Sequence, residues 1–283
     1  MTAEVEQEER ERGPLADREW RLVREEARPG PMCMALDAVA AETAAAGGPR
    51  TVRVYQWAPS TLSLGYRQDP ADVDWAFCER EGITVTRRPT GGGAIYHDHE
   101  GDISYSIIAP AAELPGDLME TYDLLCRPLL DACAAVGVPA GFAEREHPEL
   151  YHPACYLREL HPAHDVVHEG RKLSGNAQYR RRDSVIQHGS LTYSARAERT
   201  LGCFTDPPVT PEAFRERVTA LDEHADVSRG AAVETLEESL RAWADAEEGT
   251  WTDAELDRAA DIAEAKFASE AWNRRREDPL AGR

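Results

Sequence analysis

Short apolar runs separated by turn residues fill the first two thirds of the chain and predict a β-rich unit. β-Branched and aromatic residues alternate with polar ones inside these runs, which is typical of strands joined by turns. Helical periodicity appears instead at 31–46 and at 121–138, where Pro128 is expected to mark a kink or a late start. The predicted strands are 50–57, 61–66, 83–86, 94–96, 103–108, 165–168 and 184–193.

After residue 210 the pattern becomes mainly helical. Thr252 and Glu255 form a capping box, in which a residue that caps a helix N-terminus is followed three positions later by glutamate. The order of elements predicts an α+β fold with a β-rich core followed by helices. We expect an acidic, disordered tail over 1–16, a core over 17–210, and a mainly helical portion over 211–283 that packs on the core.

Composition excludes two classes of protein. A net charge of −20 and an isoelectric point near 4.9 provide no clustered basic charge for general nucleic-acid binding. No apolar run approaches the roughly 20 residues of a membrane span, and residues 1–12 are too acidic for a secretory signal, so a cytoplasmic location is expected. An acidic chain with two lysines against 30 arginines resembles proteins of extremely halophilic archaea, in which salt screens self-repulsion.

Cysteines and histidines follow no metal-binding pattern. The cysteines lack CxxC spacing, so we expect neither zinc nor a disulfide framework; most should be buried, and one reactive thiol stays open as an alternative. Five histidines between 147 and 168 fit no standard ligand spacing, which favours a solvated loop and no metal. The cysteines are Cys33, Cys78, Cys126, Cys133, Cys155 and Cys203, and the histidines are His147, His152, His161, His164 and His168.

Lys172 is one of the two lysines and lies between the glycines Gly170 and Gly175. Arginine carries a planar fork, whereas lysine carries a compact ammonium on a flexible stem. A lysine kept among arginines indicates a site that needs a point charge in a narrow place, where flanking glycines let backbone approach a ligand. The alternative is a surface lysine retained by chance.

A second glycine-rich segment, 87–94, reads Arg-Arg-Pro-Thr-Gly-Gly-Gly-Ala between two predicted strands. Consecutive glycines present backbone N–H groups without side chains in the way, which suits a phosphate or an acyl-phosphate, and two arginines could bind the same anion. The spacing matches neither a Walker loop nor a dinucleotide-binding fingerprint. The alternative is a flexible hairpin.

Together these motifs resemble the lipoate–protein ligase A and octanoyltransferase branch of the biotin/lipoate protein ligase superfamily. Four segments stand in the family's order: 87–98, 101–106, 170–177 and 187–191. Weaker similarities occur at 34–37, 64–68 and 268–273, so the resemblance extends from about residue 18 to 275. It implies a mixed β-sheet packed by helices, with the catalytic core in the 17–210 region.

The resemblance also implies an activity, which is attachment of a lipoyl or octanoyl group to a lysine of a partner protein. The expected partners are lipoyl domains of 2-oxoacid dehydrogenase E2 subunits and the glycine-cleavage H protein. In the ligase branch, ATP with Mg and lipoate or octanoate form an acyl-adenylate, which the partner's amine then attacks. A preplaced ammonium would stabilise the negative charge that develops on the carbonyl oxygen.

Most site residues carried over from the resemblance fall in or beside the two glycine-rich segments. Lys172 would contact the acyl carbonyl and phosphate, Gly65 would line the acyl slot, and His97 with Asp98 would support the glycine loop. The residues expected to bind the substrate or nucleotide are Arg88, Gly91, Gly92, Gly93, Ala94, His97, Gly65, Gly175 and Asn176.

Cys155 opens a second route. It is similar in position to the nucleophilic cysteine of octanoyltransferases, which take octanoate from acyl carrier protein through a thioester and need no ATP. Those enzymes usually carry an arginine within the glycine triplet, whereas Gly91–Gly93 is unbroken as in ligases. The ATP-dependent ligase is therefore our leading hypothesis and the Cys155 thioester its alternative. Contact between the Cys155 sulfur and the Lys172 ammonium would favour the thioester.

Three further alternatives stay open. We do not expect the large C-terminal accessory domain of some bacterial ligases in this sequence, and archaeal ligases can have that domain on a separate chain. The protein could then be a partial subunit that only binds acyl-adenylate or a carrier domain. A biotin ligase is less favoured, because its loop has a different arginine–glycine pattern. Arg180–Arg182 is most simply a hairpin tip, although it could contact an acidic carrier domain.

Overall fold

The computed structural model describes residues 15, 18–160 and 164–281. Most of the predicted tail over 1–16, together with His161, lies outside these residues. The centre is an eight-stranded sheet in the order β11-β1-β2-β6-β10-β9-β8-β7. Its strands are β1 (Trp20–Arg28), β2 (Arg50–Trp57), β6 (Asp102–Pro110), β7 (Gly141–Phe142), β8 (Asp165–His168), β9 (Arg171–Arg180), β10 (Ser184–Thr192) and β11 (Glu247–Glu248).

The sheet is mixed, as the resemblance implied. β1 pairs in parallel with β2 and β11, and the remaining neighbours pair antiparallel. A second sheet of three strands, in the order β4-β3-β5, lies beside the large one. Its strands are β3 (Thr61–Leu64), β4 (Thr84–Arg87) and β5 (Ile95–His97). The segment between β4 and β5 is the glycine loop, 88–94.

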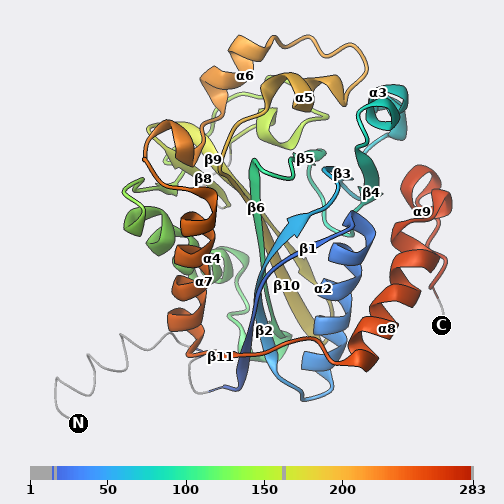
Figure 1. Ribbon diagram of the computed structural model, residues 1–283, viewed down its shortest axis with the longest axis vertical. Helices are drawn as coiled ribbons and strands as arrows, with labels where there is room; N and C mark the ends of the chain where they lie inside the picture. The colour runs from blue at the N-terminus through green and yellow to red at the C-terminus, as the bar shows by residue number, and fades with distance from the viewer. Residues whose placement is uncertain (1–14, 16–17, 161–163, 282–283) are drawn as a thin grey trace.

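Helices cover both faces of the large sheet (Figure 1). One face carries α4 (Leu118–Ala135) and α7 (Arg229–Ala244) and buries a wide apolar cluster. The other carries α2 (Gly30–Ala45), α8 (Asp253–Ile262) and the π-helical turn η5 (Ala263–Phe267), with a second cluster beneath them. The remaining helices are η1 (Pro70–Asp72), α3 (Trp75–Arg80), η2 (Ala111–Glu113), η3 (Cys155–Leu157), α5 (Ala197–Gly202), α6 (Pro211–Arg217), η4 (Leu221–Glu223) and α9 (Glu270–Arg275).

All seven predicted strands are present, with ends shifted by a few residues, and the capping box at Thr252 is confirmed by reciprocal bonds with Glu255. The late start expected at Pro128 is wrong: α4 begins at Leu118, because the Asp117 carboxylate caps its first N–H groups, and runs through the proline. Four strands were missed, β1, β7, β9 and β11. The missed β1 is rich in charged residues, which are neutralised by ion pairs such as Arg24 with Glu237.

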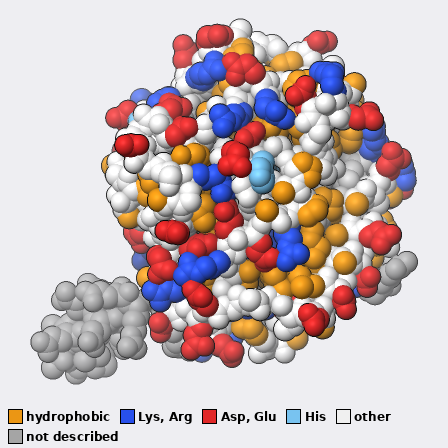
Figure 2. Space-filling view, viewed as in Figure 1, with side chains coloured by type: hydrophobic (Ala, Val, Ile, Leu, Met, Phe, Trp, Pro, Cys, Tyr) orange, Lys and Arg blue, Asp and Glu red, His pale blue; other side chains and the backbone are white. Residues whose placement is uncertain are grey.

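Among the described residues, no helix is long and apolar enough to cross a membrane. Acidic and basic side chains are interspersed over the molecular face seen in Figure 2, so the negative charge is distributed rather than gathered there. The side chains on the α2 face of the sheet, beneath the small sheet and the glycine loop, form the cavity described next.

Candidate active site

A cavity of about 380 Å³ lies on the α2 face of the large sheet. Four of its lining residues stand in register across adjacent strands: Gly175 on β9 faces Ser190 on β10, which faces Ser104 on β6, which faces Tyr55 on β2. This transverse row forms the floor. The glycine loop lies over it, with Gly91 and Gly92 in the lining.

Lys172 and the glycine loop therefore line one cavity, although 80 positions separate Gly92 from Lys172 in the chain. The Lys172 side chain is only 2% exposed. Its Nζ lies 2.7 Å from Oδ1 of Asp165, donates to the carbonyl oxygen of Cys155 at 3.2 Å, and stands 5.1 Å above the Tyr156 ring. A buried ammonium with these partners is a fixed positive charge in the cavity wall.

The charge state of this pair follows from its surroundings. Burial alone would lower the pKa of the Lys172 ammonium, but the neighbouring Cys155 and Asp165 outweigh burial and raise that pKa above its ordinary value. Burial would likewise raise the pKa of the Asp165 carboxyl, but Lys172 and His164 together hold it well below its usual range. Both groups are thus charged at neutral pH.

The Cys155 sulfur and the Lys172 ammonium both lie close to Gly175. A β-carbon placed on Gly175 would be 3.9 Å from Sγ of Cys155 and 3.7 Å from Nζ of Lys172, so both reactive atoms lie within 4 Å of one point above the floor. Of the six cysteines, all of which the structure describes, Cys155 alone lines the cavity and is partly exposed. Burial raises the pKa of the thiols of Cys33, Cys126 and Cys133 to about 12, which makes them unreactive.

The glycine loop is bonded to the cysteine segment. The N–H of Ala94 donates to the carbonyl of Pro153 at 2.6 Å, and the N–H of Cys155 donates to the carbonyl of Ala94 at 2.8 Å. A β-carbon on Gly93 would lie 2.7 Å from the Cys155 nitrogen, so only glycine permits this approach. A β-carbon on Gly65 would overlap the Gly92 carbonyl oxygen at 1.9 Å. Gly65 thus supports the loop from behind and is not among the cavity-lining residues.

Arg88 points into the loop. Its guanidinium donates to the carbonyl oxygens of Ser63, Gly91 and Gly93 at 2.7, 2.8 and 2.6 Å. The side chain is buried, and it shapes the loop through these three bonds. The resemblance had assigned Arg88 to the adenylate, but in this structure its donors contact protein carbonyls.

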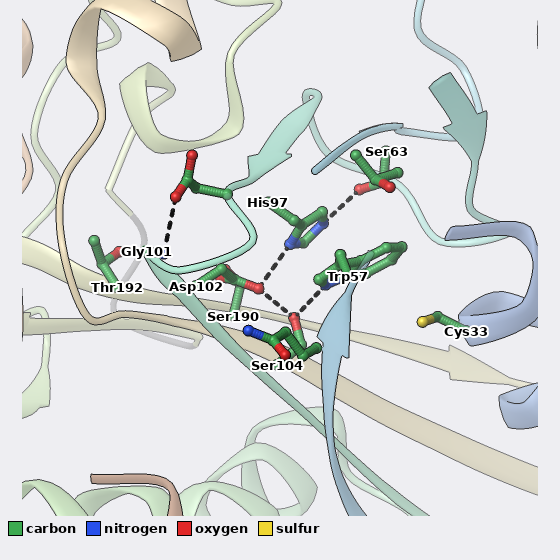
Figure 3. Close-up of polar contacts among 12 residues, drawn as sticks. Cys33, Trp57, Ser63, His97, Gly101, Asp102, Ser104, Ser190 and Thr192 are labelled. Carbon is green, nitrogen blue, oxygen red and sulfur yellow. Dashed lines mark hydrogen bonds and ion pairs between the residues drawn. The ribbon is translucent and has the colours of Figure 1, made fainter. Parts of the chain in front are cut away.

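His97 lies in a polar network between Asp102 and Ser63 (Figure 3). Its Nδ1 lies 3.1 Å from Oδ2 of Asp102 and its Nε2 lies 2.9 Å from Oγ of Ser63, while the Trp57 ring stacks on it at 4.1 Å. Asp102 also accepts hydrogen bonds from Ser104, at 2.6 Å, and from Ser190. The sequence motif contained Asp102, but its pairing with His97 was not foreseen.

Asp98 and Asn176 stabilise neighbouring segments. The Asp98 carboxylate accepts from Tyr96 Oη at 2.8 Å and from the N–H of Gly101 at 3.0 Å, so it closes the β5–β6 turn rather than the glycine loop. Asn176 accepts from Tyr105 Oη at 2.7 Å and donates to the carbonyl of His164 at 3.1 Å. It thereby fixes the segment that carries Asp165.

His188 is a lining residue that the sequence analysis missed, although it lies in the 187–191 motif. Its ring is buried, and burial together with the Arg88 charge lowers its pKa to about 3, so it is neutral. Its Nε2 lies 3.0 Å from Oγ1 of Thr90, at the start of the glycine loop. Of the four described histidines between 147 and 168, only His164 lines the cavity.

In the part of the chain that the structure describes, one group of potential metal ligands is present, at His168, Glu169 and His224. It lies at the β8–β9 turn, away from Cys155. The Arg171 guanidinium stands 3.2 Å from Nε2 of His224, and a nearby positive charge opposes cation binding.

Comparisons with known proteins identify the relatives of this chain. The family model described as the lipoyl protein ligase A/B catalytic domain matches residues 30–242. Octanoyltransferase LipM of Symbiobacterium thermophilum is 32% identical over 280 residues, which cover 91% of this chain and 98% of that protein. The LipM octanoyltransferase of Geobacillus kaustophilus is 30% identical, with 93% of this chain and 100% of that protein covered.

Solved structures show the same fold. A lipoate-protein ligase A bound with ATP superposes with a TM-score of 0.75 at 22% identity, and the match covers 90% of this chain and 98% of that one. These values support a shared α+β architecture and carry no information on which acyl donor is used.

Proposed function

The chain belongs to the lipoyl protein ligase A/B catalytic-domain family, and we propose that it is a cysteine-dependent octanoyltransferase. It would take an octanoyl group from an acyl carrier protein onto Cys155 and pass it to a lysine of a lipoyl domain. The observation that carries the proposal is the placement of the Cys155 sulfur and the Lys172 ammonium above Gly175 in one cavity. The names of the LipM relatives support it.

In the first step, the Cys155 thiolate attacks the carbonyl carbon of the carrier-bound octanoyl thioester. The bond between that carbon and the carrier sulfur breaks, and the carrier leaves as a thiol after taking a proton. In the second step, the neutral amine of the target lysine attacks the Cys155 thioester and forms an amide, while its proton passes to the returning sulfur. Negative charge develops on the carbonyl oxygen in both steps, and the Lys172 ammonium stabilises it.

Asp165 keeps the ammonium in place. Its carboxylate is 2.7 Å from Nζ and nearly fully buried, so it holds Lys172 beside the sulfur and keeps it charged. Because Asp165 keeps the Lys172 amine protonated, Lys172 does not compete with the target lysine as an acyl acceptor.

The ATP-dependent ligase is the second candidate, and the unbroken Gly91–Gly93 triplet favours it. A triphosphate needs cations that face it. Of the two cations that the ligase hypothesis assigns to the adenylate, Arg88 donates to protein carbonyl oxygens, whereas Lys172 would serve either route. The engagement of Arg88, together with the names of the LipM relatives, is why we rank the thioester route above ATP with Mg.

One assay separates the candidates. The protein is incubated with an apo-lipoyl domain or apo-H protein and either octanoyl–acyl carrier protein, or octanoate or lipoate with ATP and Mg. We expect transfer from the carrier alone, loss of transfer in Cys155→Ser, and a mass increase of one octanoyl group on Cys155. Transfer that needs ATP and survives Cys155→Ser would establish the ligase. Binding without transfer from any donor would indicate a partial subunit that requires an accessory chain.

A further inference from the structure

Two residues each line two neighbouring cavities. We infer that they mark the end of the acyl slot, which is the part of the active-site cavity that would hold the acyl chain. Besides the active-site cavity, a groove of about 950 Å³ lies between α2, α8, η5 and the far ends of β9 and β10. Met34 and His188 are the residues common to both linings. They form a partition between the two spaces.

The register of the sheet places the two cavities end to end. On the α2 face, Gly175 pairs with Ser190, and two residues further along β9 Ala177 pairs with His188. Two residues beyond that, Tyr179 pairs with Ile186, and both of these line the second groove. The His188 row therefore separates the active-site floor from the groove along the direction of the strands.

The distance from the sulfur to this partition suits a medium-length chain. Successive rows on one face are about 7 Å apart along an antiparallel strand, and the Cys155 sulfur stands above the first row. One row spacing along the strand, combined with the 3.9 Å between the sulfur and the β-carbon position of Gly175, gives a slot of about 8 Å from sulfur to partition. An extended eight-carbon chain, with bonds of about 1.5 Å, has a similar length.

The partition joins three parts of the fold. His188 comes from β10 and is hydrogen-bonded to Thr90 of the glycine loop at 3.0 Å. Met34 comes from α2, is 4% exposed, and packs in the cluster that contains Tyr55 and Trp57. An unbranched methionine fills such an irregular gap well, and its removal leaves open space.

We propose, on the basis of the octanoyltransferase function, that Met34 with His188 closes the acyl slot and sets the length of the transferred chain. Met34 is the specificity-determining residue: truncating it joins the slot to the second groove, and a longer chain continues over the Tyr179–Ile186 row. Enlarging it shortens the slot.

The test loads acyl carrier protein with chains of six to fourteen carbons and measures the acyl thioester on Cys155 by intact-protein mass spectrometry. The wild-type protein is expected to prefer eight carbons. Met34→Ala should raise the twelve-to-eight-carbon rate ratio about tenfold or more, since methylene discrimination in a closed pocket is of that order. Met34→Phe should instead raise the six-to-eight-carbon ratio. The matched control is Met32→Ala, which lies on the same helix, packs on the same cluster and lines neither cavity.

An unchanged chain-length profile in both Met34 variants overturns the inference and leaves the octanoyltransferase intact. Calorimetric titration of Cys155→Ser with octanoate and dodecanoate measures binding affinity without a covalent step. The double variant Cys155→Ser/Met34→Ala should bind dodecanoate more tightly and octanoate with unchanged affinity. Absence of any thioester in the wild-type protein refutes the proposed function, and the titration then decides the role of Met34 independently.

Discussion

Two buried cation–carboxylate pairs lie on the same face of the sheet and differ in what surrounds the cation. Arg53 on β2 contacts Asp37 on α2 at 2.9 Å, and Lys172 on β9 contacts Asp165 on β8 at 2.7 Å. All four side chains are at most 5% exposed. Equal burial thus accompanies two different roles.

The Arg53 fork is engaged by structural partners. It donates to the carbonyl of Cys33 at 2.7 Å and stacks 4.1 Å above the Tyr55 ring, and it is not part of the cavity lining. The Lys172 ammonium, by contrast, faces the cavity beside the one thiol that lines it. A planar guanidinium suits the contact between a helix and the sheet, whereas a compact ammonium suits a site where negative charge develops on a carbonyl oxygen.

The largest expected effect is on the free energy of unfolding, and it distinguishes the Arg53–Asp37 pair from the Lys172–Asp165 pair. Arg53→Met leaves the Asp37 carboxylate buried without its cation, so the free energy of unfolding should fall by about 3–5 kcal/mol. Chemical denaturation measures this loss, with Arg241→Met as the control, because the Arg241–Glu238 pair is exposed and solvent screening leaves it little effect on stability. Octanoyl transfer per folded molecule should be retained, and its loss would show that Arg53 acts in the reaction.

The next effect is on turnover. Lys172→Arg keeps the charge but places a bulky fork where an ammonium fits, so the rate of Cys155 acylation should fall by about 10²- to 10³-fold, as for loss of one oxyanion donor. Single-turnover kinetics with octanoyl–carrier protein measures this step. A variant that folds and acylates at the wild-type rate would contradict the assigned role.

Part of the candidate site could be predicted from the sequence, and physical reasons explain why the rest could not. The family resemblance assigns the segments around Gly92 and Lys172 to the same substrate, and the structure places both in one cavity lining. The strand β9 was missed because Lys172, Ser174, Gly175 and Asn176 have low β-propensity; pairing with β8 and β10 on both sides overrides it.

Side-chain direction could not be derived from the sequence. Arg88 was expected to face an anion, but its donors turn toward loop carbonyls that become neighbours only after folding. Asp165 was expected only as the first residue of a strand, and its pairing with Lys172 depends on the β8–β9 register. Met34 and His188 meet through tertiary packing alone, and no local pattern marks them as a partition.

A smaller effect tests whether the carboxylate of the catalytic pair acts through the lysine. Asp165→Asn keeps the size and an acceptor but removes one of the two charges, with that of Cys155, that raise the pKa of Lys172. The rate should fall by about ten- to a hundredfold from lost positioning, and the alkaline limb of the pH–rate profile should move to lower pH. An unchanged alkaline limb with a lower rate would mean that Asp165 supports structure only.

The smallest effect concerns stability at acid pH. The pKa of Asp165 is lowered in the folded state by Lys172 and His164 despite burial, so the unfolded chain binds the proton more readily than the folded one. The pair's contribution to stability is complete above the ordinary carboxyl pKa near 4 and is lost as pH falls through the lower folded-state value. Below about pH 4, Asp165→Asn should reduce the slope of the free energy of unfolding against pH by up to about 1.4 kcal/mol per pH unit. Guanidinium titrations at several pH values measure this slope, and an equal slope in both proteins would mean that the ion pair also persists in the unfolded chain.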